Sequence, residues 1–215
     1  KDLRMYKSFY DFCDELIVHN HATEKNLTEW FQIPRQKITV IPHGTYPARQ
    51  AQAEAKKEDA ATHFLQFGLV RKYKGIDVLL EAVARIAPEK REKMRFRIAG
   101  RQYRKLDDTD YANKIRELGI EDCVSFEEGF VAKEAVPALF QEADFVLFPY
   151  RQIYGSGALL MAYSYGKPVI ASNVPAFQEE TEDGRAGLLF ENEDPGKLAD
   201  AIVRAAESGP EQIRK

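Results

Sequence analysis

The chain has 215 residues, of which 44% are hydrophobic and 30% are charged, and its formal net charge is −3. This composition suits a folded protein of one large domain, or of one domain and part of a second, and it excludes general disorder. The charge leaves no basic excess for neutralising phosphates, so we exclude a nucleic-acid-binding function.

The sequence also shows no sign of a membrane span or a metal site. No apolar run approaches the roughly 20 residues that cross a bilayer. The first residues, KDLRMYKSFYDF, carry charges where a signal peptide has an apolar core, so we expect no leader. Cys13 and Cys123 lie far apart without a His or Cys at metal-ligand spacing. We therefore expect reduced thiols, no bound metal and a cytoplasmic location.

The first part of the chain is predicted to form a small unit followed by a linker. Helices are expected at residues 3–15 and 23–31, and strands at residues 16–19 and 37–41. The polar, alanine-rich stretch PARQAQAEAKKEDAAT that comes next has no clear apolar face. We therefore divide this part into a unit over residues 1–44 and a linker over residues 45–62.

From residue 63 onward, short apolar runs alternate with amphipathic segments. Strands are predicted at residues 63–67, 95–99, 123–126, 144–148, 168–171 and 187–190, and helices at residues 75–86, 109–118, 133–141, 156–165 and 195–206. This alternation is typical of a parallel sheet with helices on both faces. The sequence therefore predicts an α/β domain over residues 63–215 with one six-stranded, mostly parallel sheet. The two earlier strands should lie outside it.

A glycine-rich turn follows the predicted strand at residues 144–148. Gly155, Ser156 and Gly157 open the next helix, at the carboxyl end of the strand, where open α/β sheets bind ligands. Glycine lets an anion approach the backbone, and the free N–H groups of a first helical turn point at it. We predict a phosphate site at this GSG turn (residues 155–157); a tight turn that needs glycine for steric reasons is the alternative.

Two cations occupy the loop after the strand at residues 63–67. The segment FGLVRKYKGIDVLLEAV places Arg71 and Lys74 between this strand and an amphipathic helix. An arginine fork and a lysine point charge together can bracket a diphosphate. Because this loop and the GSG turn lie on the same edge of the predicted sheet, we expect them to share a ligand. The alternative is a pair of solvated surface cations.

Five segments together carry a resemblance to a known family. FGLVRKYKGIDVLLEA, FRIAG, VSFEEGFVAKEAVPALFQEADFVLFPY, GSG…YGKPVIAS and EDGRAGLLF follow one another in the order and spacing of that family. The chain resembles retaining nucleotide-sugar glycosyltransferases of the GT-B fold, the group 1 or family 4 type, over residues 14–204. The match is to their carboxy-terminal, donor-binding, Rossmann-like domain. The resemblance implies that residues 1–44 are a remnant of the amino-terminal domain and of the crossover between the two domains. It also implies that this fragment alone is inactive.

The resemblance also implies roles for individual residues. Arg71 and Lys74 would be catalytic, because they would stabilise the charge that builds on the departing nucleotide diphosphate. The loop at residues 129–131 would cover the base. For Gly100, a purely architectural role is the favoured alternative. The implied donor-binding residues are Gly68, Gly100, Gly129, Phe130, Val131, Gly155, Ser156, Gly157, Ala158 and Leu159.

The implied partners are a nucleotide-sugar donor and a glycan or lipid-linked acceptor. The acceptor would bind through the missing amino-terminal domain, in polysaccharide biosynthesis. No cofactor and no metal ion are implied. Peripheral membrane association of the longer protein stays open.

One departure from the family affects the functional prediction. The resemblance implies two glutamates separated by seven residues, one near the donor sugar and one on the ribose, and Ile153 and Met161 stand at these positions. The ribose contact is then made elsewhere, the donor is held more weakly, or activity is lost. Glu179 and Glu180 follow the next strand and could reach the site, but we expect them to be solvated loop carboxylates, so that no carboxylate lies beside the GSG turn. The alternative functions are a noncatalytic nucleotide-sugar-binding module or partner subunit and, more weakly, a sugar-nucleotide epimerase.

Overall fold

The computed structural model describes residues 3–47 and 60–213, so most of the predicted linker lies outside the described residues. Each predicted strand is present within these ranges. The strands are β1 (Leu16–Val18), β2 (Ile38–Val40), β3 (Thr62–Phe67), β4 (Met94–Gly100), β5 (Val124–Glu128), β6 (Phe145–Phe148), β7 (Val169–Ser172) and β8 (Gly187–Phe190). The α-helices are α1 (Leu3–Phe12), α2 (His21–Phe31), α3 (Ile76–Arg85), α4 (Pro88–Arg91), α5 (Tyr111–Glu117), α6 (Val136–Glu142), α7 (Gly157–Ser164), α8 (Pro175–Glu180), α9 (Pro195–Ser208) and α10 (Pro210–Ile213). Two 3₁₀-helices are η1 (Arg35–Lys37) and η2 (Lys72–Lys74).

The main sheet has six strands in the order β5-β4-β3-β6-β7-β8, and every neighbouring pair is parallel. In the centre, Phe64 of β3 pairs with Phe96 of β4 on one side and with Phe145 of β6 on the other. The strand order therefore reverses between β3 and β6, which makes their carboxyl ends the topological switch point where such sheets bind ligands. The structure confirms the predicted Rossmann-like α/β fold.

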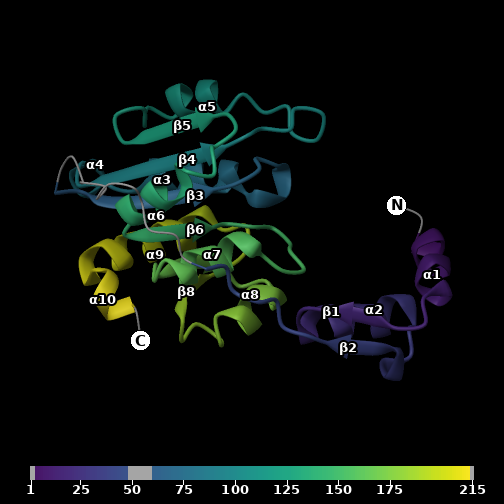
Figure 1. Cartoon of the computed structure of the whole chain (residues 1–215). Coiled ribbons are helices and arrows are strands. Elements are labelled where there is room, and N and C mark those ends of the chain that lie inside the picture. Colours follow the sequence, from purple (N-terminus) through teal and green to yellow (C-terminus); the bar gives the residue numbers. More distant parts are fainter. Residues whose placement is uncertain (1–2, 48–59, 214–215) are drawn as a thin grey trace.

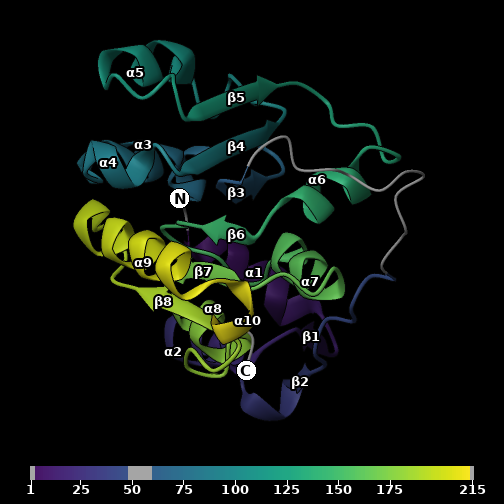
Figure 2. The same cartoon turned by 90° about the vertical axis from the view of Figure 1, so that its left-hand side faces the viewer.

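Helices cover both faces of this sheet (Figures 1 and 2). Successive strand residues point to opposite faces, so Phe64 belongs to one hydrophobic cluster and Leu65 to the other. The Phe64 cluster includes residues of α3, α5 and α9, and the Leu65 cluster includes residues of α6, α7 and α8. Because both faces are buried, the strands need continuous apolar runs, and this is the pattern that allowed their prediction.

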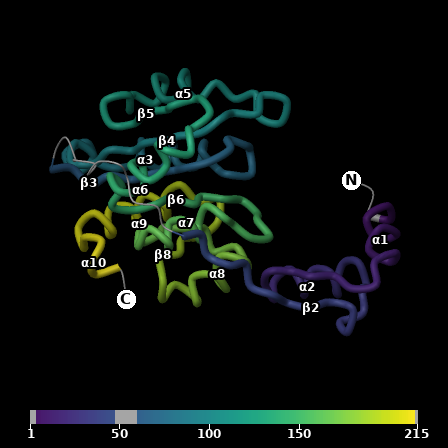
Figure 3. Tube along the Cα trace, in the orientation of Figure 1, coloured from purple at the N-terminus to yellow at the C-terminus, as the bar shows by residue number. Residues whose placement is uncertain are grey.

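The amino-terminal segment forms a separate small unit (Figure 3). Strands β1 and β2 make a two-stranded parallel sheet outside the main one, as predicted. Val18, Leu27, Ile33 and Ile38 form its core, and α2 packs against α8 of the larger unit. The division into a remnant, a linker and a donor-binding domain stays a prediction.

Short helices are the main difference from the predicted elements. The sequence analysis predicted no helix where α4, α8, α10 and both 3₁₀-helices lie. Elements of three to six residues are too short to show a 3.6-residue hydrophobic period. A usable signal was the proline that starts three of them, Pro88, Pro175 and Pro210, because proline suits the first turn of a helix. Among the described helices, none is both long and apolar enough to cross a membrane.

Candidate functional site

The GSG turn ends the loop after β6 and begins α7. Ser156 is the N-cap of α7, and its Oγ accepts a hydrogen bond from the Leu159 N–H at 3.3 Å. The Ser156 carbonyl also accepts from this N–H, at 3.1 Å, so Leu159 is already satisfied within the turn. The N–H groups of Gly157 and Ala158 have no acceptor among the described residues. Two free donors therefore point from the positive end of α7, where an anion is stabilised.

Lys74 ends η2 and points inward from the loop after β3. Its residue surface is 6% exposed, and its Nζ donates a hydrogen bond to the Tyr150 hydroxyl at 2.7 Å. Among the described residues no carboxylate pairs with Lys74. Burial, followed by the nearby positive charge of Arg71, lowers the pKa of Lys74 from 10.5 to about 8. A buried ammonium group without a counterion is unfavourable, so this position favours the approach of an anion.

Arg71 also lacks an acidic partner within the part of the chain that the structure describes. Its guanidinium carbon lies 5.9 Å from the centre of the Tyr103 ring, and its buried Nε has no hydrogen-bond partner there. The neighbouring cation Lys72, by contrast, pairs with Asp108 at 3.4 Å. The two cations that the sequence singled out are therefore the ones in this loop that remain without a carboxylate.

Tyr150 connects the lysine to the GSG turn. Its phenol is buried, its hydroxyl accepts from Lys74, and the Ser156 side chain lies close enough to this hydroxyl to influence its pKa. Burial raises the pKa of Tyr150, so the hydroxyl stays neutral. The structure thus brings Lys74 and the GSG turn to one hydroxyl group. The sequence analysis missed Tyr150, although its position at the carboxyl end of the buried run DFVLFPY was a usable signal.

Arg151 fixes the η2 loop against the end of β6. Its two terminal nitrogens donate to Asp77 at 2.9 and 2.8 Å, and Nη1 also donates to the Lys72 carbonyl at 2.7 Å. Burial raises the pKa of Asp77, but the hydrogen bonds from Arg151 outweigh it and the net pKa is lowered. This bidentate pair stays charged and holds the backbone that carries Arg71 and Lys74.

The glycines at the strand ends bring backbone segments close together. Gly68 has φ +109°, and a Cβ there would lie 3.1 Å from the Lys74 Nζ. A Cβ on Gly100 would lie 1.9 Å from the Gly68 carbonyl oxygen, closer than atoms can approach. This contact supports the architectural role for Gly100, which the sequence analysis favoured.

The third predicted loop, residues 129–131, forms no hydrogen bond with Lys74 or with the GSG turn among the described residues. The Gly129 N–H donates to the Gly100 carbonyl at 3.2 Å, and Phe130 is 84% exposed. Val131 packs against the cluster on the α6–α8 face. Among the described residues no hydrogen bond joins Phe130 or Val131 to Lys74 or to the GSG turn. A base-covering role for this loop stays a prediction.

The two residues at the positions of the family's glutamates are packed as apolar side chains. Ile153 lines a cavity of about 340 Å³ that also includes Trp30 of α2. Both Ile153 and Met161 pack against the hydrophobic cluster on the α6–α8 face. Neither side chain offers a strong hydrogen-bond acceptor, so these positions provide no carboxylate for a ligand.

The predicted absence of a carboxylate beside the GSG turn is wrong. Glu179 and Glu180 end α8 instead of lying in a loop, and the Glu180 Oε1 lies 3.7 Å from the position of a Cβ on Gly155. Its Oε2 is buried and has no hydrogen-bond partner among the described residues. Burial raises the pKa of Glu180 to about 7, the Ser156 hydrogen bond lowers it, and Glu179 raises it. The position of Glu180 after the next strand placed it within reach of the site, but no local sequence pattern indicated that its side chain would be buried there.

The small amino-terminal unit reaches the same turn. The Asn20 side chain donates to the Tyr154 carbonyl at 2.5 Å, directly before Gly155. The Glu179 carboxylate accepts from the backbone N–H groups of His21 and Ala22, at 2.9 and 3.0 Å. The larger unit thus provides an acidic cap for the first turn of α2.

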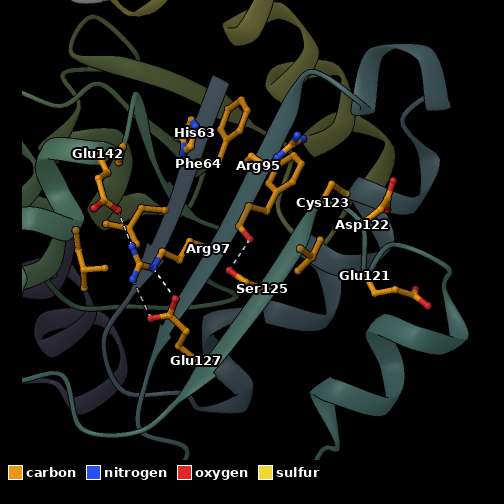
Figure 4. Close-up of a pocket in the computed structure, with 15 residues that line it drawn as sticks. His63, Phe64, Arg95, Arg97, Glu121, Asp122, Cys123, Ser125, Glu127 and Glu142 are labelled. Atoms are coloured by element: carbon orange, nitrogen blue, oxygen red, sulfur yellow. Dashed lines mark hydrogen bonds and ion pairs between the residues drawn. The ribbon is translucent and has the colours of Figure 1, made fainter. Parts of the chain in front are cut away.

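A groove of about 490 Å³ lies elsewhere, against β3, β4 and β5 and beside α6 (Figure 4). Arg97 points into it and donates to Glu127 at 2.7 and 3.2 Å and to Glu142 at 2.6 Å. Neither Lys74 nor the GSG turn lines this groove. Because two carboxylates already neutralise its central cation, the groove does not attract a phosphate as the strand-end site does.

Comparisons with known proteins identify the family to which the chain belongs. The family model described as glycosyl transferases group 1 matches residues 61–208. A D-inositol 3-phosphate glycosyltransferase from Corynebacterium aurimucosum is 29% identical over 94% of this chain and 51% of its own length. A GDP-mannose:glycolipid 4-beta-D-mannosyltransferase from Xanthomonas campestris is 34% identical over 91% of this chain and 49% of its own length. The chain therefore spans about half the length of these curated relatives.

A solved structure shares the fold over nearly the whole chain. The Anabaena protein Alr3699/HepE, in complex with UDP and glucose, matches with a TM-score of 0.84 and 21% identity. The match covers 98% of this chain and 58% of that one.

Proposed function

Because the chain belongs to the group 1 glycosyl transferases and corresponds to the carboxy-terminal half of their GT-B fold, we propose that it binds the nucleotide-diphosphate sugar donor of a glycosyltransferase. The observation that carries the proposal is the buried Lys74, which has no carboxylate partner among the described residues and reaches the GSG turn through Tyr150. A diphosphate would supply the missing negative charge. Arg71, Lys74 and the N–H groups of α7 would hold it without a metal ion.

The proposed reaction moves the sugar from the diphosphate to an acceptor hydroxyl with retention of configuration. The bond between the anomeric carbon and the diphosphate oxygen breaks, and the acceptor oxygen bonds to that carbon and loses its proton. Negative charge grows on the departing diphosphate, and Lys74 and Arg71 stabilise it together with the helix donors. A nearby anion also raises the pKa of Lys74 from its value of about 8, so that the ammonium is fully charged in the complex.

The acceptor side of the reaction belongs to the longer protein in this proposal. The Xanthomonas relative is named for a glycolipid acceptor, and the Anabaena structure contains UDP and glucose. These names support a lipid-linked acceptor and a nucleotide-sugar donor. A glycan acceptor and a role in polysaccharide biosynthesis are further parts of the proposal. The acceptor would bind mainly through the rest of the amino-terminal domain, in the cytoplasm, and this chain alone would not catalyse transfer.

One observation favours a second function, a noncatalytic nucleotide-sugar-binding module. Ile153 and Met161 are packed as apolar side chains at the positions of the family's two glutamates. A module of this kind would bind the donor as tightly as an enzyme but would not turn it over. Donor hydrolysis and sugar transfer by the full-length protein therefore separate the two functions.

We expect Gly157→Val to reduce nucleotide-diphosphate binding by at least about tenfold, on the scale of a lost charged hydrogen bond. A side chain at this position would stand in front of the donors at the start of α7. The fold should persist, because the atom nearest to the new Cβ would be the Tyr46 hydroxyl, at 2.9 Å, at the end of a side chain that is 41% exposed and can move away. Calorimetric titration with UDP, GDP and ADP measures the loss, and thermal unfolding checks the fold.

Uridine, guanosine and adenosine are the matched control ligands, because they carry the same bases without phosphate. The proposal requires that the substitution weakens a diphosphate far more than the nucleoside. Undiminished diphosphate binding by a folded Gly157→Val variant would remove the phosphate from this turn.

A further inference from the structure

Tyr46 belongs to the segment that follows β2 (residues 41–47), and its side chain lies against the GSG turn. The Tyr46 hydroxyl oxygen is 2.9 Å from the position of a Cβ on Gly157, and the ring carbons Cε2 and Cζ are 3.5 and 3.6 Å from the same position. These distances are contacts with the space that a side chain at residue 157 would fill. The glycine therefore lets the phenol approach the first turn of α7.

The Tyr46 hydroxyl is free to bind a ligand. It has no hydrogen-bond partner in the part of the chain that the structure describes, and the residue is 41% exposed. A tyrosine hydroxyl can both donate and accept a hydrogen bond. The N–H groups of Gly157 and Ala158, which also lack an acceptor among the described residues, begin the same helical turn. Three unused donors therefore lie close together at the start of α7.

Two histidines hold the Tyr46 ring in place without using its hydroxyl. The centre of the His43 ring lies 5.6 Å from that of Tyr46, and the His19 ring lies edge-on to His43 at 5.1 Å. The His19 Nδ1 donates to the Ile41 carbonyl at 2.9 Å, which fixes the end of β1 to the start of the segment. The position of the phenol therefore depends on ring contacts, and the hydroxyl remains available.

We infer that Tyr46 is a donor-site residue whose hydroxyl donates a hydrogen bond to the phosphate bound at the GSG turn. The inference rests on the proposed function. A phosphate oxygen accepts several hydrogen bonds, and those from a neutral donor to a charged oxygen are stronger than those between neutral groups. The segment after β2 would then contribute directly to the site, beside the loops after β3 and β6. Stacking of the Tyr46 ring on a ligand is a different role, and the experiment below distinguishes the two.

The experiment is calorimetric titration of Tyr46→Phe with UDP, GDP and ADP, at a single pH of about 7, so that the charge of Lys74 is the same for every variant. The substitution removes the hydroxyl and keeps the ring. We expect the dissociation constant of the bound diphosphate to increase about five- to twentyfold, on the scale of a lost hydrogen bond to a charged group. Binding of uridine, guanosine and adenosine should not change. The unfolding temperature of the free protein should not fall, because the hydroxyl has no partner there among the described residues.

Two further variants show whether the hydroxyl of Tyr46 is responsible. Tyr154→Phe removes a hydroxyl from the 59% exposed residue before Gly155, which lines the cavity beside Trp30, and should bind as the wild type does. Tyr46→Ala removes the ring as well and should bind no more than about twofold more weakly than Tyr46→Phe, because one hydrogen bond is lost in both.

Four results would overturn the inference. They are undiminished diphosphate binding by Tyr46→Phe, an equal loss of nucleoside binding, an equal loss in Tyr154→Phe, and a loss in Tyr46→Ala that greatly exceeds the loss in Tyr46→Phe, which would assign the contact to the ring. In each case the wild type still binds the diphosphate, so the proposed function survives. Failure of the wild type to bind any of the three diphosphates would overturn both.

Discussion

Lys74→Met is expected to weaken nucleotide-diphosphate binding by about 1–3 kcal/mol, roughly 5- to 150-fold, and at the same time to stabilise the free protein. The loss follows from removing an ammonium group that has no other anionic partner among the described residues. The gain follows from burial, because lowering the pKa from 10.5 to about 8 corresponds to roughly 3 kcal/mol against the charged form. The Tyr150 hydroxyl loses its donor in the variant, so we expect a net gain of about 1–2 kcal/mol in the free energy of unfolding.

The pH dependence of stability provides an independent test of the same substitution. The unfolded chain retains the Lys74 proton up to about pH 10.5, whereas the folded chain releases it near pH 8. The free energy of unfolding of the wild type therefore increases as the pH rises from 8 towards 10.5. Below pH 8 the destabilisation caused by burying the charged Lys74 ammonium is fully present. Urea unfolding at pH 7, 8 and 9 should show this rise in the wild type and a smaller one in Lys74→Met.

Lys72→Met is the matched control for both measurements. It removes the same charge from the same loop, but the Lys72 side chain is 65% exposed and its ammonium pairs with Asp108. Its stability and affinity should change little, since exposed ion pairs contribute less than about 1 kcal/mol. A destabilised Lys74→Met protein with undiminished nucleotide affinity would show that Lys74 serves the fold and not an anion.

Gly100→Ala is expected to destabilise the fold by about 3 kcal/mol or more, at the upper end of the cost of overpacking. The added Cβ would lie 1.9 Å from the Gly68 carbonyl oxygen and 2.7 Å from its carbon. Both obstructing atoms belong to the backbone, so rotation of a side chain cannot relieve the clash. Chemical denaturation monitored by circular dichroism measures the loss.

Gly129→Ala is the control, because Gly129 follows the neighbouring strand β5 and a Cβ there would meet nothing within 4 Å. Its stability should remain close to that of the wild type. Equal stability of the Gly100 and Gly129 variants would mean that β3 and β4 can separate at their ends more easily than the structure indicates.

The sequence predicted the sheet well because each strand is buried on both faces. An apolar run such as FVLF in β6 has few possible conformations other than a buried strand when amphipathic segments flank it. The loops of the site were also predictable. Glycine directly after a strand indicates a tight turn or an anion site, and paired cations there indicate an anion site or a solvated loop. What the sequence lacked was a 3.6-residue hydrophobic period for the four- and six-residue helices α4, α8 and α10, whose only local signal is the proline that starts each of them.

Several residues of the site contact residues that are distant in the sequence, and no local sequence pattern predicts such contacts. Tyr150 joins Lys74 to Ser156, and it is 76 residues from the lysine in sequence. Glu180 was predicted to be solvated because glutamate usually is, yet packing of α8 beside the GSG turn buries one of its oxygens. The assignment of Arg71 and Lys74 to a diphosphate stays a prediction, supported now by their lack of acidic partners among the described residues.

The position of β3 in the middle of the sheet also has a consequence for synthesis on the ribosome. One edge of β3 can pair with β4 soon after both emerge, but the other edge must wait for β6, whose register begins 81 residues later. At about 5–20 residues per second, this delay is roughly 4–16 s. During that time Phe64 and Leu65 belong to a strand whose backbone N–H and C=O groups are unpaired along one edge, which is the kind of edge on which nascent chains aggregate. Translation speed between β3 and β6 should therefore influence the yield of soluble protein more than translation speed elsewhere in the chain.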